Sequence, residues 1–135
     1  MKRNLTIHIY SFSYHGSGIP PDPAGHGGGF VFDCRALPNP GREERYREMT
    51  GMDPEVVRYL EERGEVAVFR ERVFGLVLDT AEAEDARGFA DMTVAFGCTG
   101  GRHRSVYFAE ELAGDLRRRG FSCTVEHRDL PGVSV

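Results

Sequence analysis

The chain has 135 residues, of which 40% are apolar and 28% are charged, enough for one core without disulfides or structural metal ions. Its 17 basic and 21 acidic side chains give a net charge of −4, which excludes a uniformly basic nucleic-acid-binding surface. No apolar run approaches the roughly 20 residues that cross a bilayer, and the N-terminus lacks the apolar stretch of a signal peptide. We therefore expect one domain over residues 1–135, in the cytoplasm and without a membrane partner.

The first third of the chain predicts two strands around an irregular segment. Leu5, Ile7 and Ile9 alternate with more polar residues, as in a strand with one covered face. Residues 15–29 contain six glycines and three prolines, which predicts a mobile loop. This loop, which carries His15 and His26, is either a lid over a ligand or a plain connector. The apolar run 30–32 predicts a short strand buried on both faces.

The middle of the chain predicts two helices. Asp53-Pro54 supplies an N-cap residue and a proline at the first helical position, so a short helix is expected to end before Gly64. Apolar residues at three- and four-residue steps predict a second helix over residues 65–80. Residues 79–91 contain five acidic side chains and one arginine, which favours a solvated helix end followed by a loop.

The last third predicts a strand, a turn, a helix and a final strand. A buried strand is expected over residues 92–96, a turn over 97–104, a helix over 105–119 and a half-exposed strand over 121–126. Gly120 is suited to the position just after a helix. Helices between such strands predict an α/β fold with a mainly parallel sheet of about four strands and helices packed on it.

The turn between the third strand and the last helix carries the clearest functional signal. Its glycines allow successive N–H groups to face one point, and the helix start adds positive potential. Arginine near a helix N-terminus is unfavourable unless an anion lies close by. We therefore predict a phosphate cradle, and the alternative is a tight turn whose arginines extend into water. The predicted ligand-binding residues are Asp33, Arg35, Cys98, Thr99, Gly100, Gly101, Arg102, His103, Arg104 and Ser105.

A catalytic alternative uses the same turn. Cys98 and Arg104 form a Cys-x5-Arg pattern followed by Ser105, which resembles the phosphate-binding loop of the cysteine-dependent phosphatases. A helix N-terminus and Arg104 would lower the pKa of the thiol and so favour the nucleophilic thiolate. The general acid would then be Asp33, Asp22 or Asp129. The other interpretation of Cys98 is a small buried residue at a strand end.

Two further polar clusters have two interpretations each. Asp33 either accepts a hydrogen bond from a sugar hydroxyl or amine, or pairs with an arginine of the cradle to hold it in place. The sequence His127-Arg128-Asp129 either adds polar groups at the carboxyl edge of the sheet or is a solvent-exposed chain end. No trio of histidine, cysteine and carboxylate has metal-ligand spacing, so we expect neither a metal nor a cofactor.

Several long segments resemble a known family. Residues 30–40 (FVFDCRALPNP), 50–51, 94–107 and 127–130 are similar, in the same order, to the C-terminal domain of RapZ, the bacterial RNase adapter family. The resemblance implies a non-enzymatic regulatory domain that binds glucosamine-6-phosphate and small RNA, with a fold like a phosphofructokinase subdomain. It also implies that the sugar-phosphate site includes Asp33, Cys98, Thr99, Gly100, His103 and Arg104.

The resemblance also raises the question of partners. Family proteins carry an N-terminal kinase-like domain with a nucleotide loop, and no such loop occurs in this sequence. We therefore expect a stand-alone module that is either a homo-oligomer or works with a separate partner protein. Binding of small RNA would use Arg102 and Arg104 together with Arg117, Arg118, Arg119 and Arg128, and it requires these arginines to share one face.

Overall fold

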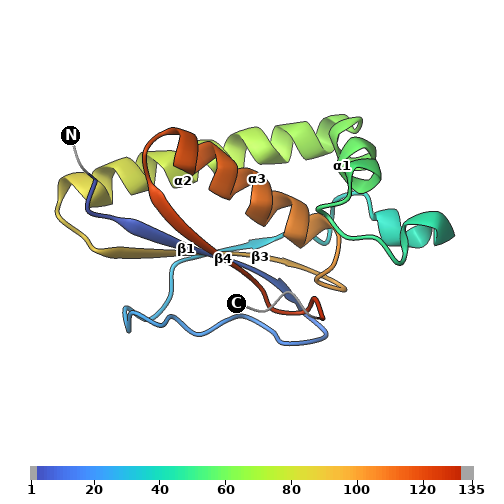
Figure 1. Cartoon of the computed structure of the whole chain (residues 1–135), viewed down its shortest axis with the longest axis horizontal. Helices are drawn as coiled ribbons and strands as arrows, with labels where there is room; N and C mark the ends of the chain where they lie inside the picture. Colours follow the sequence, from blue (N-terminus) through green and yellow to red (C-terminus); the bar gives the residue numbers. More distant parts are fainter. Residues whose placement is uncertain (1–2, 132–135) are drawn as a thin grey trace.

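The chain forms a four-stranded parallel sheet with three α-helices packed on it, according to a computed structural model that describes residues 3–131 (Figure 1). The strand order is β2-β3-β1-β4. The elements are β1 (Thr6–Ser13), β2 (Phe30–Asp33), α1 (Pro54–Glu61), α2 (Gly64–Ala86), β3 (Asp91–Cys98), α3 (Arg104–Arg118) and β4 (Ser122–His127), with short 3₁₀ helices at Pro40–Arg42 and Glu44–Tyr46. The predicted α/β class and parallel sheet are confirmed. Within residues 3–131, no helix has the length and apolar character needed to cross a membrane.

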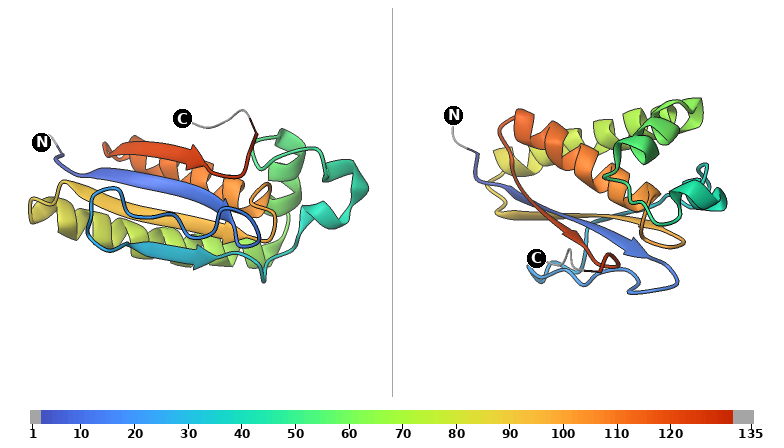
Figure 2. Two further views of the ribbon diagram at one scale, coloured as in Figure 1. Left: turned by 90° about the horizontal axis from the view of Figure 1, so that it is seen from below. Right: turned by 45° about the vertical axis from the view of Figure 1, so that its right-hand side comes forward.

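The three helices cover one face of the sheet, and the segment between β1 and β2 crosses the other (Figure 2). The connections from β2 to β3 and from β3 to β4 both contain helices, and both run from the β2 edge toward the β4 edge of the sheet. The connection from β1 to β2 leads in the opposite direction. Because parallel crossovers are almost always right-handed, a reversal of direction places the connection on the opposite face. Residues 14–29 therefore cover the sheet and do not form a lid over its carboxyl edge.

The core lies between the sheet and the helices. Ile9 of β1, Val94 of β3 and Leu112 of α3 are fully buried there. An aromatic series runs through this layer, with ring centroids 5.6 Å apart between Phe32 and Phe96 and 5.8 Å apart between Phe96 and Phe108. This packing fixes the start of α3 against the ends of β2 and β3.

The extents of α2 and β3 and the burial of β2 differ most from the sequence-based prediction. Helix α2 continues to Ala86, because its last turns are rich in the strong helix formers Ala and Glu and because Ala81 is buried. Strand β2 is an edge strand whose Val31 is 40% exposed, so the prediction that it is buried on both faces was wrong. Strand β3 continues to Cys98, which confines the turn to residues 99–103.

Gly51 allows a close approach between the segment before α1 and the start of α3. Its N–H donates to the carbonyl oxygen of Arg102 at 2.9 Å. A methyl group at Gly51 would overlap with the main-chain oxygen of His103 and the main-chain nitrogen of Tyr107. Neither atom can move without displacing the first turn of α3, so only glycine fits.

We predict that Gly51→Ala lowers the free energy of unfolding by about 2 kcal/mol, because the main chain of α3 must shift. Gly75→Ala is the matched control, since Gly75 lies inside α2 with open space around it. The control should raise stability by about 1 kcal/mol through helix propensity. Urea denaturation followed by circular dichroism measures both changes. Equal stability of the Gly51→Ala variant and the parent would contradict the close approach.

Candidate functional site

The predicted cradle lies at the carboxyl edge of the sheet, where β2 and β3 end and α3 begins. Asp33 pairs with Gly97 across the two strands, so the end of β2 lies directly beside the start of the turn. The turn is anchored from β1 as well, because the hydroxyl of Ser13 donates to the carbonyl oxygen of Thr99 at 2.6 Å. The topology thus brings Asp33, Arg35 and the turn to one edge, as the sequence predicts.

The main chain of the turn presents a row of free donors. None of the backbone N–H groups from Thr99 to His103 donates to another residue within 3–131. Thr99 and Gly100 are exposed, and Gly101 has a left-handed backbone with φ +65°. A side chain at Gly101 would meet the main-chain nitrogen of Ser13 at 2.8 Å. Free N–H groups in such a turn, followed by the N-terminus of α3, form an arrangement suited to an oxyanion.

The side chain of Arg104 is buried, with 3% of its surface exposed, and it joins two parts of the edge. Its Nη1 donates to the carbonyl oxygens of Arg35 and Leu37, each at 2.9 Å, and to that of Cys34 at 3.3 Å. Its Nε is buried without a hydrogen-bond partner among the described residues. One nitrogen of the guanidinium thus holds the chain after β2, while another remains free.

Arg102 and His103 also bind main-chain oxygens. Arg102 donates from Nε to Met49 at 3.0 Å and from Nη2 to Glu48 at 2.8 Å, and Nε2 of His103 lies 2.8 Å from the carbonyl oxygen of Tyr46. Burial lowers the pKa of His103, and the nearby charges of Arg102 and Arg104 lower it further. These contacts give the three basic side chains a structural role that the charge pattern alone did not predict.

Asp33 and Arg35 pair with each other. Arg35 donates from Nε to Oδ1 of Asp33 at 2.9 Å and from Nη2 to Oδ2 at 2.7 Å. This hydrogen bonding lowers the pKa of the Asp33 carboxyl group. The guanidinium also lies over the ring of Tyr14, 3.7 Å from its centroid. The alternative in which Asp33 holds an arginine of the turn was wrong, because the partner is Arg35 of its own segment.

The thiol of Cys98 faces the core. Cys98 is 2% exposed, and its Sγ lies 3.2 Å from the hydroxyl oxygen of Ser105, which is itself fully buried. Cys34 lies on the same helix-covered side of the sheet, and burial raises the pKa of its thiol well above the ordinary value. The contact between Cys98 and Ser105 closes the base of the turn. It therefore favours the interpretation of Cys98 as a small buried residue.

A cavity of about 430 Å³ opens beside the turn. Its lining combines the predicted residues Arg35, Thr99 and Arg104 with residues that the sequence did not single out as site residues, namely Ala36, Leu37, Pro38, Asn39, Arg42, Glu43, Tyr59 and Glu65. The segment Leu37-Pro38-Asn39-Pro40 was the available signal, because prolines fix a chain that must turn back over the edge. Asp33 does not belong to this lining.

His127 and Asp129 are structural parts of the same edge. His127 is 3% exposed, so the interpretation of its segment as a solvent-exposed chain end was wrong. Its ring nitrogens lie 2.7 Å from Ser11 Oγ and 2.7 Å from Glu110 Oε2, which links β1 to α3. The carboxylate of Asp129 accepts from the main-chain nitrogens of Ser13 and Ser17 and so organises the turn after β1.

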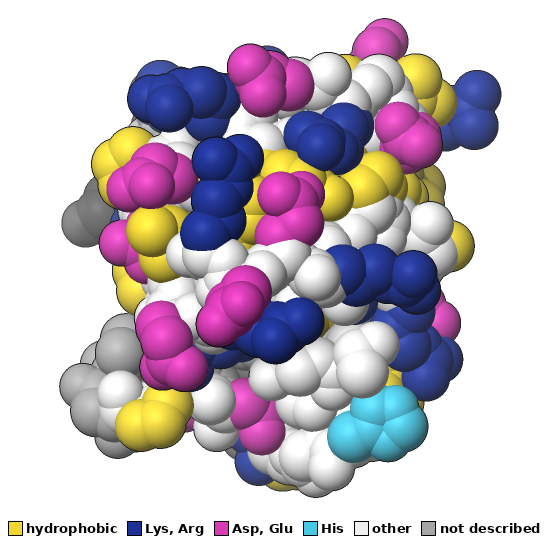
Figure 3. Space-filling model, turned by 90° about the vertical axis from the view of Figure 1, so that its right-hand side faces the viewer, with side chains coloured by type: hydrophobic (Ala, Val, Ile, Leu, Met, Phe, Trp, Pro, Cys, Tyr) yellow, Lys and Arg dark blue, Asp and Glu magenta, His cyan; other side chains and the backbone are white. Residues whose placement is uncertain are grey.

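The arginines proposed for RNA binding lie mostly at the two ends of α3. Arg117, Arg118 and Arg119 lie at the C-terminal end of α3, whereas Arg102 and Arg104 lie at its start. A helix of 15 residues separates the two groups by roughly 20 Å, at about 1.5 Å per residue. The two groups therefore do not form one compact basic cluster. At the end that carries the cradle, arginines are interspersed with acidic side chains and form no continuous basic surface (Figure 3).

Comparison with known proteins places this architecture in a family. The family model of the RapZ C-terminal domain matches residues 5–131. A nucleotide-binding protein of Alkalilimnicola ehrlichii is 43% identical over 126 residues, which are 93% of this chain and 42% of that protein. A nucleotide-binding protein of Acidobacterium capsulatum is 40% identical over 96% of this chain and 40% of its own length. The chain thus spans about two fifths of the length of these relatives.

We predict that Arg104→Met lowers the free energy of unfolding by about 3 kcal/mol, since one buried and two part-buried hydrogen bonds from a charged donor are lost. Arg104→Lys should lose less, because an ammonium group can still donate to several of these oxygens. Thermal unfolding of both variants beside Arg118→Ala, whose side chain is 69% exposed, measures the difference. Equal destabilisation of the methionine and lysine variants would contradict the carbonyl contacts.

His103 should make stability depend on pH. Its pKa is lower in the folded chain than the ordinary 6.5, so the unfolded chain binds more protons. Stability from this group is therefore complete above pH 6.5 and is lost as the pH falls toward the folded pKa. We expect stability to fall between pH 7.5 and 5.5 by up to about 1.4 kcal/mol more in the parent than in His103→Gln. Urea denaturation at both pH values tests this, and identical losses would refute it.

Proposed function

Because the chain belongs to the family of the RapZ C-terminal domain, we propose that it binds a phosphorylated amino sugar, with the phosphate in the turn before α3. The row of free main-chain N–H groups from Thr99 to His103 carries this proposal. Phosphate oxygens accept hydrogen bonds from such a row, and the positive end of the α3 dipole favours their charge. The curated relatives are named nucleotide-binding proteins, and nucleotides also carry phosphate.

The cavity beside the turn supplies the remaining contacts. The unpartnered Nε belongs to Arg104, which lines this cavity with Arg35 and Arg42, so positive charge surrounds the proposed phosphate position. Glu43 and Glu65 lie in the same lining and offer acceptors to the hydroxyl or ammonium groups of a sugar. Asp33 is the weaker candidate for that contact, because Arg35 already binds both of its oxygens. The volume of about 430 Å³ lies within the range of small-molecule sites.

The two other functions have less support. A cysteine-dependent phosphatase needs an accessible thiolate, whereas Cys98 is 2% exposed and its sulfur faces Ser105. An RNA-binding surface is favoured by clustered arginines, whereas the candidates are divided between the two ends of α3. Binding of a compact dianion in the turn requires neither an accessible thiolate nor a cluster of arginines.

Isothermal titration calorimetry tests the proposal with glucosamine-6-phosphate as the ligand. We expect saturable binding of this sugar phosphate and at least tenfold weaker binding of unphosphorylated glucosamine, since each charge-assisted hydrogen bond contributes roughly 1.5–3 kcal/mol. Arg104→Lys removes the free Nε and should weaken binding about tenfold. Arg118→Ala should leave it unchanged, because Arg118 pairs with Asp115 at the far end of α3.

Adenosine monophosphate is the third ligand in the same experiment. Tighter binding of this nucleotide than of the sugar phosphate would refute the sugar assignment and leave the phosphate site standing. Equal heats for glucosamine and its phosphate, or unchanged binding in Arg104→Lys, would refute the phosphate site itself.

A further inference from the structure

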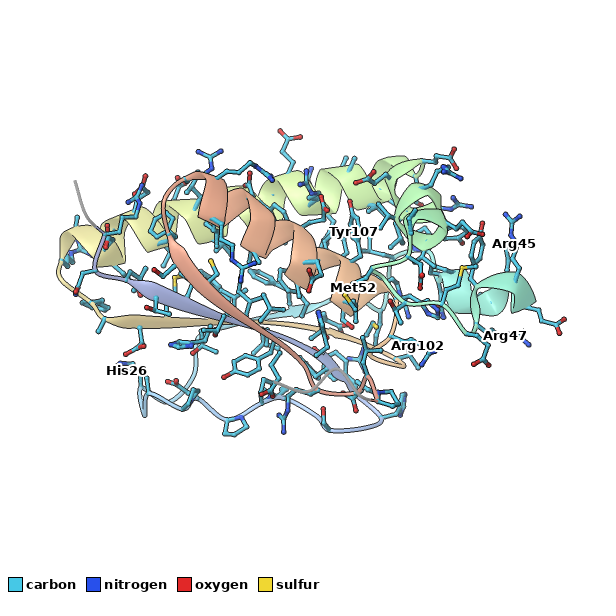
Figure 4. All side chains as sticks on the ribbon, viewed as in Figure 1. His26, Arg45, Arg47, Met52, Arg102 and Tyr107 are labelled. Carbon is cyan, nitrogen blue, oxygen red and sulfur yellow. The ribbon has the colours of Figure 1, made fainter. Side chains whose placement is uncertain are left out.

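The amino edge of the sheet, at the opposite end of the molecule, has two adjoining cavities. Their volumes are about 320 and 410 Å³, and their linings share Asp22, His26, Gly28, Gly29, Phe30 and Thr93. The first opens between the last turns of α2, the start of β3 and the glycine-rich segment before β2. His26 marks this end and Arg102 the other, so the cavities lie far from the cradle (Figure 4).

Two aromatic rings and a methionine give the first cavity an apolar interior. The ring of Phe30 stacks on that of Phe32, with ring centroids 5.3 Å apart. Phe89 is 49% exposed, and its main chain is fixed by a hydrogen bond from its N–H to the carbonyl oxygen of Glu84 at 3.0 Å. Met92 completes this side. Large aromatic side chains that line a cavity and stay exposed provide a surface for an apolar group.

The charges around the first cavity are negative. Asp22, Glu84 and Asp91 line it, and no residue within 3–131 forms an ion pair or hydrogen bond with the carboxylate of Glu84. Asp91 is engaged by His8 at 2.7 Å. Helix α2 ends here. Its last turn has no basic side chain that would offset the negative end of the helix dipole. Arg87 follows the helix but belongs to neither lining.

The wall that faces α2 is pre-organised by Asp22. Its carboxylate accepts from the main-chain nitrogens of Ala24, His26 and Gly28, at 2.8–3.3 Å, and from the hydroxyl of Thr93 at 3.2 Å. Burial alone would raise the pKa of Asp22, but these hydrogen bonds lower it. The glycine-rich segment is therefore tied to β3, and the cavity does not require a ligand to shape it.

We propose that this end of the molecule binds a small organic amine, with its ammonium group beside Glu84 and its apolar body between Phe30 and Phe89. Opposite charge and cation–π attraction both favour a cation here. An anion of the same shape would meet three carboxylates and the negative end of α2. The site is independent of the proposed phosphate cradle, because the two share no residue.

Phenethylamine, 2-phenylethanol and 3-phenylpropionate are the probes, since they share a phenyl body and differ in charge. In spectra of the ¹⁵N-labelled chain, phenethylamine should shift the amide signals of Gly28, Gly29 and Phe89 in a saturable manner. The alcohol should bind roughly fivefold more weakly, and the carboxylate should not bind, given the usual strength of cation–π and exposed ionic contacts. Equal affinity for the amine and the carboxylate, or no saturable shifts with the amine, would overturn the proposal.

Variants locate the site. Glu84→Gln and Phe89→Ala should each weaken phenethylamine binding about fivefold. Glu82→Gln is the matched control, because Glu82 is also a carboxylate of the last turns of α2 but pairs with Arg3 and lies outside both linings. Unchanged binding in Glu84→Gln, or the same loss in the control, would overturn the assignment. Folding of each variant is checked by circular dichroism, and the three probes decide the matter on the parent chain if a variant unfolds.

Discussion

The guanidinium of Arg104 is the contact on which the carboxyl edge depends. After β2 ends, the chain must leave the sheet with carbonyl oxygens that no strand partner can satisfy, and Nη1 of Arg104 donates to those of Cys34, Arg35 and Leu37. A buried carbonyl group without a donor costs about 1–3 kcal/mol. The carbonyl of Cys34 also accepts from the N–H of Leu37, whereas those of Arg35 and Leu37 are part-buried. One side chain at the first position of α3 thus fixes the direction of a segment about 70 residues earlier in the chain.

This use of Arg104 changes how the charge pattern of the turn is understood. Arginine and histidine at a helix N-terminus indicate a nearby negative partner, and the sequence suggested that the partner is a bound anion. The structure provides carbonyl oxygens as partners for all three basic side chains, including Met49 and Glu48 for Arg102 and Tyr46 for His103. The free N–H groups of the main chain are therefore the stronger support for a bound anion. Among the side chains, the buried and unpartnered Nε of Arg104 still supports the original reasoning.

The apolar pattern predicted the parallel α/β fold well, because β1, α1 and α3 bury regular sets of apolar residues and β3 is a continuous buried run. It could not predict the extent of α2, whose last turns carry mostly acidic residues on their exposed side and bury only Ala81. It also could not identify β2 as an edge strand, because a short apolar run such as Phe30–Phe32 is compatible with either a central or an edge strand. The site was predicted where it depends on local sequence, as in the glycine turn. Glu43 and Glu65 were missed because they reach the cavity only through the packing of the segments before α1 and α2.

The fold itself separates positive from negative ends. Helices α2 and α3 run against the direction of the strands, so the N-terminus of α3 lies at the carboxyl edge and the C-terminus of α2 lies at the amino edge (Figure 1). Aligned peptide dipoles give the first position a partial positive charge and the second a partial negative charge. Side chains reinforce both, with Arg35, Arg42 and Arg104 at one cavity and Asp22, Glu84 and Asp91 at the other. A chain with a net charge of −4 thus has a locally positive carboxyl edge and a negative amino edge, which is the polarity that the proposed anion and cation sites require.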